Sequence, residues 1–577
     1  MSGALGAKAQ VDAAVAEAMA RVLPRDLAAG DPLVRRSDRA DYQSNAALGL
    51  AKRAGIAPRE LAQSLLESLP ADNLHAELSG PGFLNLTLTD AALWHVVAGR
   101  LADERMGVGT PGHGSRTLVD YSGPNIAKQL HVGHIRSTVI GDALVRVLTY
   151  LGADVVKVNH LGDWGTSFGK LIQYLDEHTE LSLDGIDLDV LDDVYKAAQQ
   201  QFEADPEFAT RARARVVELQ AGDEATLAAW HKLVEVSTDA FQALYQRLGI
   251  LLTAEDATPE SFYNPWLDDV VSELDAKGML TESDGALCVF LDGVADSEGE
   301  PLPLIVRKSD GGYGYAATDL AAVRYRVGEL KATRMLYVID SRQALHLRMV
   351  FETARQAGWL PNNVEAAHIP FGTILGTNGR PFKSRSGSTP RLKELLDAAI
   401  EGAQAVVAEK SADLPPAEFD HVVQAAGIGA VKYADLSNAR VKDYVFDPER
   451  MVSLTGNTSV YLQYAHARAC SILRKADEST PVVDATLPTH QAERALILTL
   501  DEFGAVLADV GETLEPHRLC TYLFELAKAF NDFWQNCPIL KAESAALRAN
   551  RIALTRLTQR TLSTGIALLG IEAPHRL

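Results

Sequence analysis

The sequence contains only four cysteines, Cys288, Cys470, Cys520 and Cys537, and no two of them form a Cys-x-x-Cys pair. This spacing supports neither a disulfide framework nor a cysteine-rich zinc site. We therefore expect the four side chains to be buried thiols, and we expect no structural zinc and no metal ligands.

Long apolar runs are also missing. No run approaches the roughly 20 residues that are needed to cross a bilayer, and residues 1–20 are typical of a helix, not of a secretory signal. We therefore expect an intracellular, cytoplasmic protein with no membrane partner. Hydrophobic residues make up 47% of the chain and charged residues 23%, which is typical of folded domains and not of disordered or fibrous chains.

Positive charge is scarce, because 55 Lys and Arg stand against 76 Asp and Glu and the net charge is -21. Indiscriminate nucleic-acid binding needs a broad positive field, so any RNA-binding surface must be a local patch. The segment 541–577 is one candidate, because its charged residues are mostly basic. They are Lys541, Glu543, Arg548, Arg551, Arg556, Arg560, Glu572 and Arg576. A solvated helix face is an equally good interpretation.

The 577 residues exceed what one hydrophobic core usually supports, so two to four domains are expected. Residues 1–106 combine an amphipathic stretch at 9–23 with short strand-like runs at 76–88, which predicts a small α+β module. The glycine-rich segment 107–114 then marks a domain boundary.

The second domain, 115–394, begins with a β-α-β pattern in which strand-like runs at 117–122 and 153–160 flank a helix with an apolar stripe. A second crossover is predicted at 332–358. Buried parallel strands joined by helices indicate a Rossmann-type sheet, whose ligands bind at the carboxyl ends of the strands.

Helical patterns account for most of the remaining chain. The acidic segment of about 176–250 is predicted to be a helical insertion in the second domain, and 395–577 is predicted to be an all-α helical bundle. The expected fold class is therefore a multidomain α/β protein.

A possible phosphate-binding motif follows the first strand of the predicted sheet. His131, Gly133 and His134 stand where the next helix begins, and a helix N-terminus exposes unpaired N–H groups and a partial positive charge. Gly133 would let a nucleotide approach the backbone. The alternative is a pair of capping or metal-binding histidines.

A second basic motif lies in 379–389. Lys383 and Arg385 flank Ser384 between glycines, as expected of a loop whose cations close over a triphosphate and then release pyrophosphate. Taken alone, such a segment is more often a solvated turn.

Together these motifs resemble those of the class I aminoacyl-tRNA synthetases, in which a HIGH motif and a KMSKS loop bind ATP on a Rossmann-type sheet. The resemblance narrows to the arginyl-tRNA synthetases through four stretches and covers essentially the whole chain. The stretches are 119–142, 159–172, 429–447 and 456–468. It implies ligation of L-arginine to tRNA(Arg) through an arginyl-adenylate, with ATP and Mg²⁺ as cofactors and AMP and pyrophosphate as products.

The resemblance also implies catalytic roles for His131, His134, Lys128 and Lys383, with Gly133, Ser384 and Arg385 completing the ATP site. Arg385 stands where most class members have a second lysine. As in the arginine family, Lys128 would then supply the missing cation to the developing charge on the α-phosphate. The alternative for Lys128 is an exposed surface lysine.

An arginine pocket needs carboxylates, because a guanidinium is planar, permanently charged and best held by a forked acceptor. By resemblance, the arginine-binding residues are Asp120, Asn125, Tyr315, Asp319 and Gln343. Tyr315 and Asp319 would share one helical face. Alternatively, Asp319 is a helix N-cap and Asp120 bonds a neighbouring turn.

One part of the pocket motif departs from the family pattern. Gln343 and His346 match it, but Arg342 replaces a smaller residue and Leu347 replaces Phe. The resemblance therefore does not extend to these two positions.

The terminal domains resemble RNA-binding parts of the family. The N-terminal module is similar to a tRNA-elbow domain, with Phe83 and Asn85 as contacts, and the C-terminal bundle is similar to an anticodon-binding domain. There Tyr461, Tyr464 and Arg468 have helical spacing and suit stacking and phosphate binding, although a packed core stripe fits equally well. We expect a monomer.

Two other functions are alternatives to the predicted arginine–tRNA ligation. Another class I ligase or a small adenylyltransferase would share His131 and His134 but not Asp120, Tyr315 and Asp319 as a set. A non-catalytic tRNA-binding relative would be expected to have lost site residues.

Overall fold

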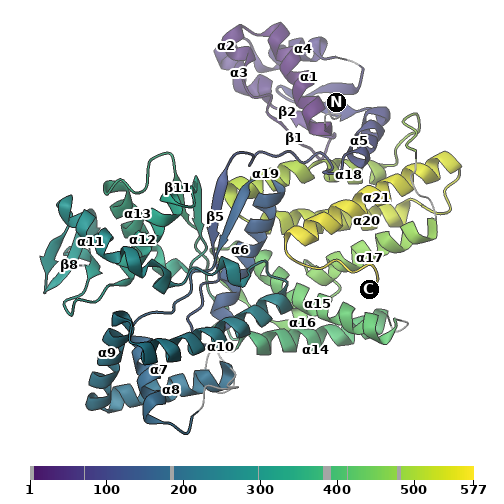
Figure 1. Cartoon of the computed structure of the whole chain (residues 1–577). Helices are drawn as coiled ribbons and strands as arrows, with labels where there is room; N and C mark the ends of the chain where they lie inside the picture. Colours follow the sequence, from purple (N-terminus) through teal and green to yellow (C-terminus); the bar gives the residue numbers. More distant parts are fainter. Residues whose placement is uncertain are drawn as a thin grey trace.

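A computed structural model describes residues 6–70, 72–181, 188–295, 298–380, 391–411, 414–476 and 482–577. Figure 1 shows an N-terminal module, a central sheet with helices on both sides, and a large helical C-terminal part. Within the described ranges, no helix combines the length and the apolar character that a membrane span requires. All four cysteines are free and buried, as the sequence predicted.

The N-terminal module is an antiparallel sheet covered by helices. Its strands follow the order β1-β2-β4-β3, and β4 pairs on one side with β2 and on the other with β3. The strands are β1 (Val34–Arg36), β2 (Tyr42–Ser44), β3 (Leu74–Ser79) and β4 (Phe83–Leu88). The helices are α1 (Ala7–Val22), α2 (Arg25–Ala28), α3 (Ala46–Ala54), α4 (Pro58–Ser68) and α5 (Asp90–Ala102).

The central sheet is parallel, with the order β11-β10-β5-β6. Its strands are β5 (Arg116–Asp120), β6 (Asp154–Val158), β10 (Arg334–Tyr337) and β11 (Glu365–His368). Asp120, the last residue of β5, is in register with Tyr337 and Val158. The carboxyl ends of three strands therefore meet beside it.

Helices cover both faces of this sheet. Alternate side chains of β5 enter different cores, since Val119 joins the core that includes α6 (Val132–Tyr150) and Leu118 joins the core that includes α12 (Tyr315–Gly328) and α13 (Ala344–Gln356). Figure 1 shows α6 on one side of β5, with α12 and α13 on the other. The predicted Rossmann-type arrangement is confirmed.

Two insertions extend the central domain. The first is helical, as predicted, and contains α7 (Thr166–Glu177), α8 (Leu188–Ala204), α9 (Pro206–Ala221) and α10 (Glu224–Leu248). The second was not predicted. It contains α11 (Leu267–Ala276) and an antiparallel sheet of β7 (Thr281–Ser283), β8 (Ala286–Ala295) and β9 (Pro301–Arg307).

The C-terminal part consists mainly of helices. They are α14 (Leu392–Lys410), α15 (Pro416–Leu436), α16 (Pro448–Met451), α17 (Ser459–Ala476), α18 (Gln491–Asp501), α19 (Phe503–Thr513), α20 (His517–Asn536) and α21 (Ala545–Leu568). One short strand, β13 (Tyr444–Val445), pairs in parallel with β12 (Ile374–Leu375) of the central domain.

Buried ion pairs join the parts. Arg100 of α5 lies 2.7 Å from Asp501 of α18, so the N-terminal module is attached to the C-terminal helices. Arg136 of α6 lies 3.1 Å from Asp435 of α15, and both side chains are almost completely buried. The helix that follows β5 is thereby fixed against the C-terminal part.

Candidate active site

His131 and His134 cap the helix that follows the first central strand. His131 is the N-cap of α6, and its Nδ1 accepts a hydrogen bond from the Gly133 N–H at 3.0 Å. The His134 Nδ1 accepts from the His131 N–H at 3.2 Å. The capping interpretation and the phosphate-binding interpretation are therefore compatible, because these bonds use only one nitrogen of each ring.

The two imidazoles are neutral donors. Burial lowers the pKa of His131, and it lowers the pKa of His134 more strongly, with further lowering by the nearby charges of His131 and Lys128. Since each Nδ1 is an acceptor, the proton of each neutral ring lies on Nε2. A Cβ at position 133 would lie 2.8 Å from the His131 ring, so only glycine fits there.

Lys128 is not an isolated surface lysine. Its Nζ lies 4.8 Å from the centre of the Tyr195 ring, which α8 of the helical insertion supplies. Burial would raise the pKa of the Tyr195 hydroxyl, but a hydrogen bond with Ser167 and the charges of Lys128 and Lys170 outweigh it and lower this pKa. The insertion therefore positions a cation next to the histidines.

Asp120 lies at the carboxyl end of β5, where its buried carboxylate is 2.7 Å from the Arg326 guanidinium of α12. This ion pair accounts for the position of the carboxylate, so the alternative that Asp120 bonds a neighbouring turn is not required to explain it. Burial raises the pKa of Tyr337 to about 12, and the charges of Asp120 and Asp319 add to the rise. The two predicted carboxylates therefore lie in one neighbourhood.

Asp319 lies one turn into α12, which begins at Tyr315 with Gly314 as its N-cap. The N-cap alternative for Asp319 is therefore wrong. Its carboxylate is 2.6 Å from the His346 Nε2, and this hydrogen bond raises the pKa of His346. Tyr315 is 72% exposed at the start of the same helix, so the predicted shared face is present and open to a ligand.

Two further carboxylates, which the sequence analysis missed, lie beside this pair. Burial raises the pKa of Glu260 to about 8, and the charges of Asp163 and Asp319 add to the effect. Burial also raises the pKa of Asp163 to about 6, against the hydrogen bonds that it accepts from Ser261. Glu260 begins a short 3-10 helix in an irregular segment, so no periodic pattern pointed to it.

The amide side chains predicted for the pocket occupy different settings. Asn125 is exposed and forms a parallel bridge with Gly162, where a Cβ would lie 2.1 Å from the Asn125 Oδ1. Gln343 is exposed at the N-terminus of α13. Arg342 turns to Asp340 at 2.9 Å, and Leu347 is buried in the core. Of the two departures from the family pattern, Leu347 therefore belongs to the core, whereas Arg342 is exposed and pairs with Asp340.

Lys383, Ser384 and Arg385 lie outside the described residues. Description resumes at Arg391, which forms an antiparallel bridge with His131. The Leu392 N–H donates to the Leu130 carbonyl at 2.9 Å. The chain after the basic motif is therefore anchored beside the two histidines.

The predicted RNA contacts are half-buried. Phe83 and Asn85 lie on β4, where the Asn85 Oδ1 accepts a hydrogen bond from Gln43 at 2.8 Å. Arg468 of α17 lies 4.8 Å from the centre of the Tyr464 ring and 4.3 Å from that of Trp534. Tyr461 accepts a hydrogen bond from Asn531 at 2.8 Å. Each of these side chains keeps a solvent-facing part.

The basic segment 541–577 does not form the free patch that was considered. Arg551 is buried and lies 2.6 Å from Glu493, and Arg560 donates to the carbonyls of Leu101 and Asp103. Both the RNA-patch and the solvated-face interpretations are wrong for these two arginines, because they hold structural elements together.

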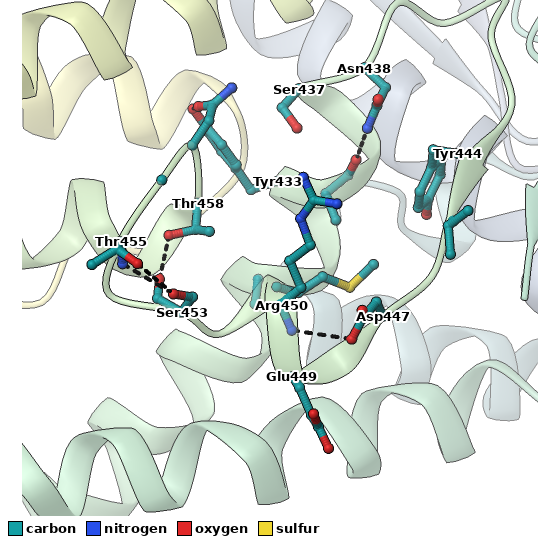
Figure 2. A pocket seen from close by; sticks show the side chains of 16 residues that line it. Tyr433, Ser437, Asn438, Tyr444, Asp447, Glu449, Arg450, Ser453, Thr455 and Thr458 are labelled. Carbon is teal, nitrogen blue, oxygen red and sulfur yellow. Dashed lines mark hydrogen bonds between the residues drawn. The ribbon is translucent and has the colours of Figure 1, made fainter. Parts of the chain in front are cut away.

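Away from these residues, a cavity of about 830 Å³ lies where α15 meets the loop before α17. Figure 2 shows the Arg450 guanidinium pointing into it. Tyr433, Asn438 and Asn457 also line this cavity. The site therefore offers a cation and several hydrogen-bonding groups.

Comparisons with protein families match most of the chain. The family described as "tRNA synthetases class I (R), catalytic domain" matches residues 97–448. The "DALR anticodon binding domain" matches 462–577, and the "Arginyl tRNA synthetase N terminal domain" matches 8–88.

Relatives and solved structures agree with these matches. The chain is 57% identical to "Arginine--tRNA ligase" of Frankia casuarinae, with 98% of each chain covered, and 49% identical to that of Streptomyces avermitilis, with 100% of each covered. Arginyl-tRNA synthetase structures from Plasmodium falciparum and Thermus thermophilus are each 26% identical. Their TM-scores are 0.82 and 0.79, and they cover 98% of this chain and 98% and 99% of their own.

Proposed function

The chain belongs to the arginyl-tRNA synthetases of class I and attaches arginine to tRNA(Arg), and we propose here which of its residues serve each step. In the first step the arginine carboxylate attacks the α-phosphorus of ATP, and pyrophosphate leaves. In the second, the 2′-hydroxyl of the terminal adenosine takes the arginyl group from the adenylate, and AMP leaves. The observation that supports the assignment is an electrostatic link between the histidines and the carboxylates. Burial raises the pKa of Tyr315, and the charges of Glu260 and Tyr195 both add to the rise. Burial lowers the pKa of His131, and so does the charge of Lys128, which contacts the Tyr195 ring.

His131, His134 and Lys128 bind and neutralise the phosphates. The two Nε2–H groups donate to phosphoryl oxygens, and Lys128 supplies a positive charge as the pentacovalent α-phosphate forms. Gly133 gives the nucleotide access to the backbone at the start of α6. The family resemblance also assigns Lys383, Ser384 and Arg385 to the ATP site.

Mg²⁺ would accompany ATP and neutralise charge on the departing pyrophosphate. The side chains around the start of α6 are imidazoles and a cation, which do not suit Mg²⁺, because this hard ion prefers oxygen ligands. We therefore propose that the triphosphate oxygens and water would hold the ion.

Carboxylates select arginine. Asp319 and Glu260 offer negative charge to the guanidinium, and the Tyr315 hydroxyl and Gln343 amide would add hydrogen bonds. Arg326 neutralises much of the Asp120 charge, so Asp120 contributes through its remaining oxygen and not as a free anion. Asn125 would hold the α-amino group of the substrate.

We propose that tRNA contacts three parts of the chain, with boundaries at 1–106, 115–394 and 395–577. Phe83 and Asn85 would contact the tRNA elbow, and Tyr461, Tyr464 and Arg468 would contact the anticodon loop by stacking and charge. The cavity around Arg450 would receive a further nucleotide. We also propose that the enzyme acts as a monomer in the cytoplasm.

Arginine-dependent ATP–pyrophosphate exchange, with and without tRNA, tests this assignment. Asp319→Asn should raise the KM for arginine about 10- to 100-fold, because a charge-assisted hydrogen bond contributes roughly 1.5–3 kcal/mol, and it should leave the KM for ATP unchanged. Lysine should not replace arginine.

Asp509→Asn is the matched control, because Asp509 forms a surface pair with Arg518 far along the chain. The carboxylate assignment fails if Asp319→Asn changes the KM for ATP instead, or if the control behaves like Asp319→Asn.

A further inference from the structure

Two imidazoles and a thiol meet where α17 contacts the end of the chain. His466 and Cys470 lie one turn apart on α17, and His575 comes from the C-terminal tail. The Cys470 Sγ is 3.6 Å from the His466 Nε2 and 3.4 Å from the His575 Nδ1. The possible ligand atoms all lie within 4.8 Å of one another.

The two sulfur–nitrogen separations match an edge of a zinc tetrahedron. Zn–S bonds of about 2.3 Å and Zn–N bonds of about 2.0–2.1 Å at a tetrahedral angle place sulfur and nitrogen about 3.6 Å apart. A thiol has one proton and can donate to only one of the two imidazoles. A metal ion, in contrast, would use the sulfur and both nitrogens at once.

The surroundings orient the ligands. The His466 Nδ1 lies 3.1 Å from the Pro574 carbonyl and donates to it, which leaves the Nε2 lone pair as the possible metal ligand. Metal-binding histidines commonly have such a second hydrogen bond. The Cys470 Sγ lies 3.9 Å from the Nδ1 and 3.6 Å from the Nε2, so a rotation of the thiol or of the ring would accompany metal binding. The Gln559 amide nitrogen lies 2.9 Å from the His466 Nε2 and donates to it, and the same side chain contacts Cys470. Zinc would replace this hydrogen bond at the Nε2, and a water would complete the shell.

We propose that His466, Cys470 and His575 form a Zn²⁺ site. Binding replaces the proton of the Cys470 thiol, which passes to solvent, while the two histidines contribute neutral nitrogen lone pairs. The ion attaches the C-terminal tail to α17, the helix that carries Tyr464 and Arg468. The proposal replaces the expectation of no structural zinc, which rested on cysteine spacing alone. Cys470 and His575 lie 105 residues apart, so spacing could not reveal the site.

Zinc retention by the full-length protein tests the site. Protein treated with a chelator is incubated with ZnCl₂, desalted and assayed for metal by mass spectrometry, and its thermal unfolding is followed with and without zinc. Co²⁺ is a second probe, because a tetrahedral thiolate site gives visible absorption and a thiolate-to-metal charge-transfer band. The variants are His575→Ala and Cys470→Ala, with Cys288→Ala as the control for a buried cysteine elsewhere.

We expect one zinc ion per chain and a higher unfolding temperature with zinc for the wild type and Cys288→Ala. His575→Ala and Cys470→Ala should bind zinc at least about 100-fold more weakly, since even indirect partners of a metal commonly account for 10- to 100-fold. Because His575 is exposed, His575→Ala should fold normally. Its zinc binding therefore tests the proposal even if Cys470→Ala fails to fold. Zinc bound equally by His575→Ala, or not retained by the wild type, overturns the proposal.

Discussion

The Arg326 guanidinium lies 2.7 Å from the Asp120 carboxylate, and both side chains are buried beside the candidate substrate pocket. Arg326→Leu leaves the carboxylate without its countercharge. Because an unpaired buried charge costs about 3–5 kcal/mol, we expect a large drop in the thermal unfolding temperature. Scanning calorimetry measures the change.

Arg324→Leu is the matched control, because Arg324 lies on the same helix in a partly exposed pair with Glu273. Its loss should cost about 1 kcal/mol or less. The double variant Asp120→Asn, Arg326→Gln keeps a neutral hydrogen-bonding pair and should be more stable than Arg326→Leu. Equal destabilisation by Arg324→Leu and Arg326→Leu would contradict the role given to this ion pair.

Glu260 gives arginine binding a pH dependence. Its pKa of about 8 means that it is mostly protonated at pH 7, whereas a bound guanidinium favours the ionised form. Binding therefore releases a proton, and the Kd for arginine should fall as pH rises from 7 to 8, by up to about tenfold per unit. Above that range the Kd should level off. Calorimetric titration at several pH values measures this slope.

Glu260→Gln should reduce the slope and weaken arginine binding above pH 8. Glu255→Gln is the control and should behave like the wild type, because Glu255 is exposed in the same segment. The slope that this variant shows includes any contribution from the α-amino group of arginine. A slope that is identical in Glu260→Gln and the wild type would show that Glu260 does not face the substrate.

The sequence predicted those features that depend on local periodicity. The parallel strand 117–122, the helix after it and the helical insertion all follow from repeating apolar positions, and the structure has them as β5, α6 and α7–α10. Tyr315 and Asp319 were placed on one helical face because they are four residues apart, and both lie on α12.

Features that depend on long-range pairing were not predicted. The strands β7, β8 and β9 are partly exposed and lie beside turns, so their period-2 pattern is weak. Glu260 and Asp163 acquire raised pKa values only through burial that other elements provide. Arg551 is buried in an ion pair with Glu493, which is 58 residues away in the sequence.

Arg468 should contribute to tRNA binding. Its guanidinium lies between the Tyr464 and Trp534 rings on a half-exposed surface, where it can meet a phosphate or stack on a base. Arg468→Ala should weaken tRNA(Arg) binding by roughly 1–3 kcal/mol, or about 10- to 100-fold, and should reduce the salt dependence by about one charge. Fluorescence titration at several salt concentrations tests both effects.

Lys475→Ala serves as the control on the same helix, because Lys475 is exposed in the last turn of α17. Arginine binding should not change in either variant. If both variants weaken tRNA binding equally, a general charge effect explains the result and the Arg468 contact is not supported.

Lys432 couples the stability of the enzyme to alkaline pH. Its buried Nζ donates to the Leu248 carbonyl at 2.9 Å and to the Gly570 carbonyl, at the ends of α10 and α21, and burial lowers its pKa from 10.5 to about 8. Between pH 8 and 10.5 the unfolded chain binds more protons at this residue than the folded chain. Its contribution to the free energy of unfolding therefore rises with pH in that window and is constant below it.

The rise should amount to about 3 kcal/mol, because each unit of pKa difference corresponds to about 1.4 kcal/mol. Lys432→Met lacks the two hydrogen bonds at every pH. It also lacks the titrating ammonium, so its free energy of unfolding should not show this rise with pH. The difference between wild type and Lys432→Met in urea unfolding should therefore grow from pH 8 to pH 10, whereas Lys528→Met, on the exposed face of α20, should give a constant difference. If the difference in the free energy of unfolding between wild type and Lys432→Met is also constant with pH, the prediction is wrong. In that case the Lys432 ammonium stays charged in the folded protein, because the nearby Asp142 carboxylate compensates for burial.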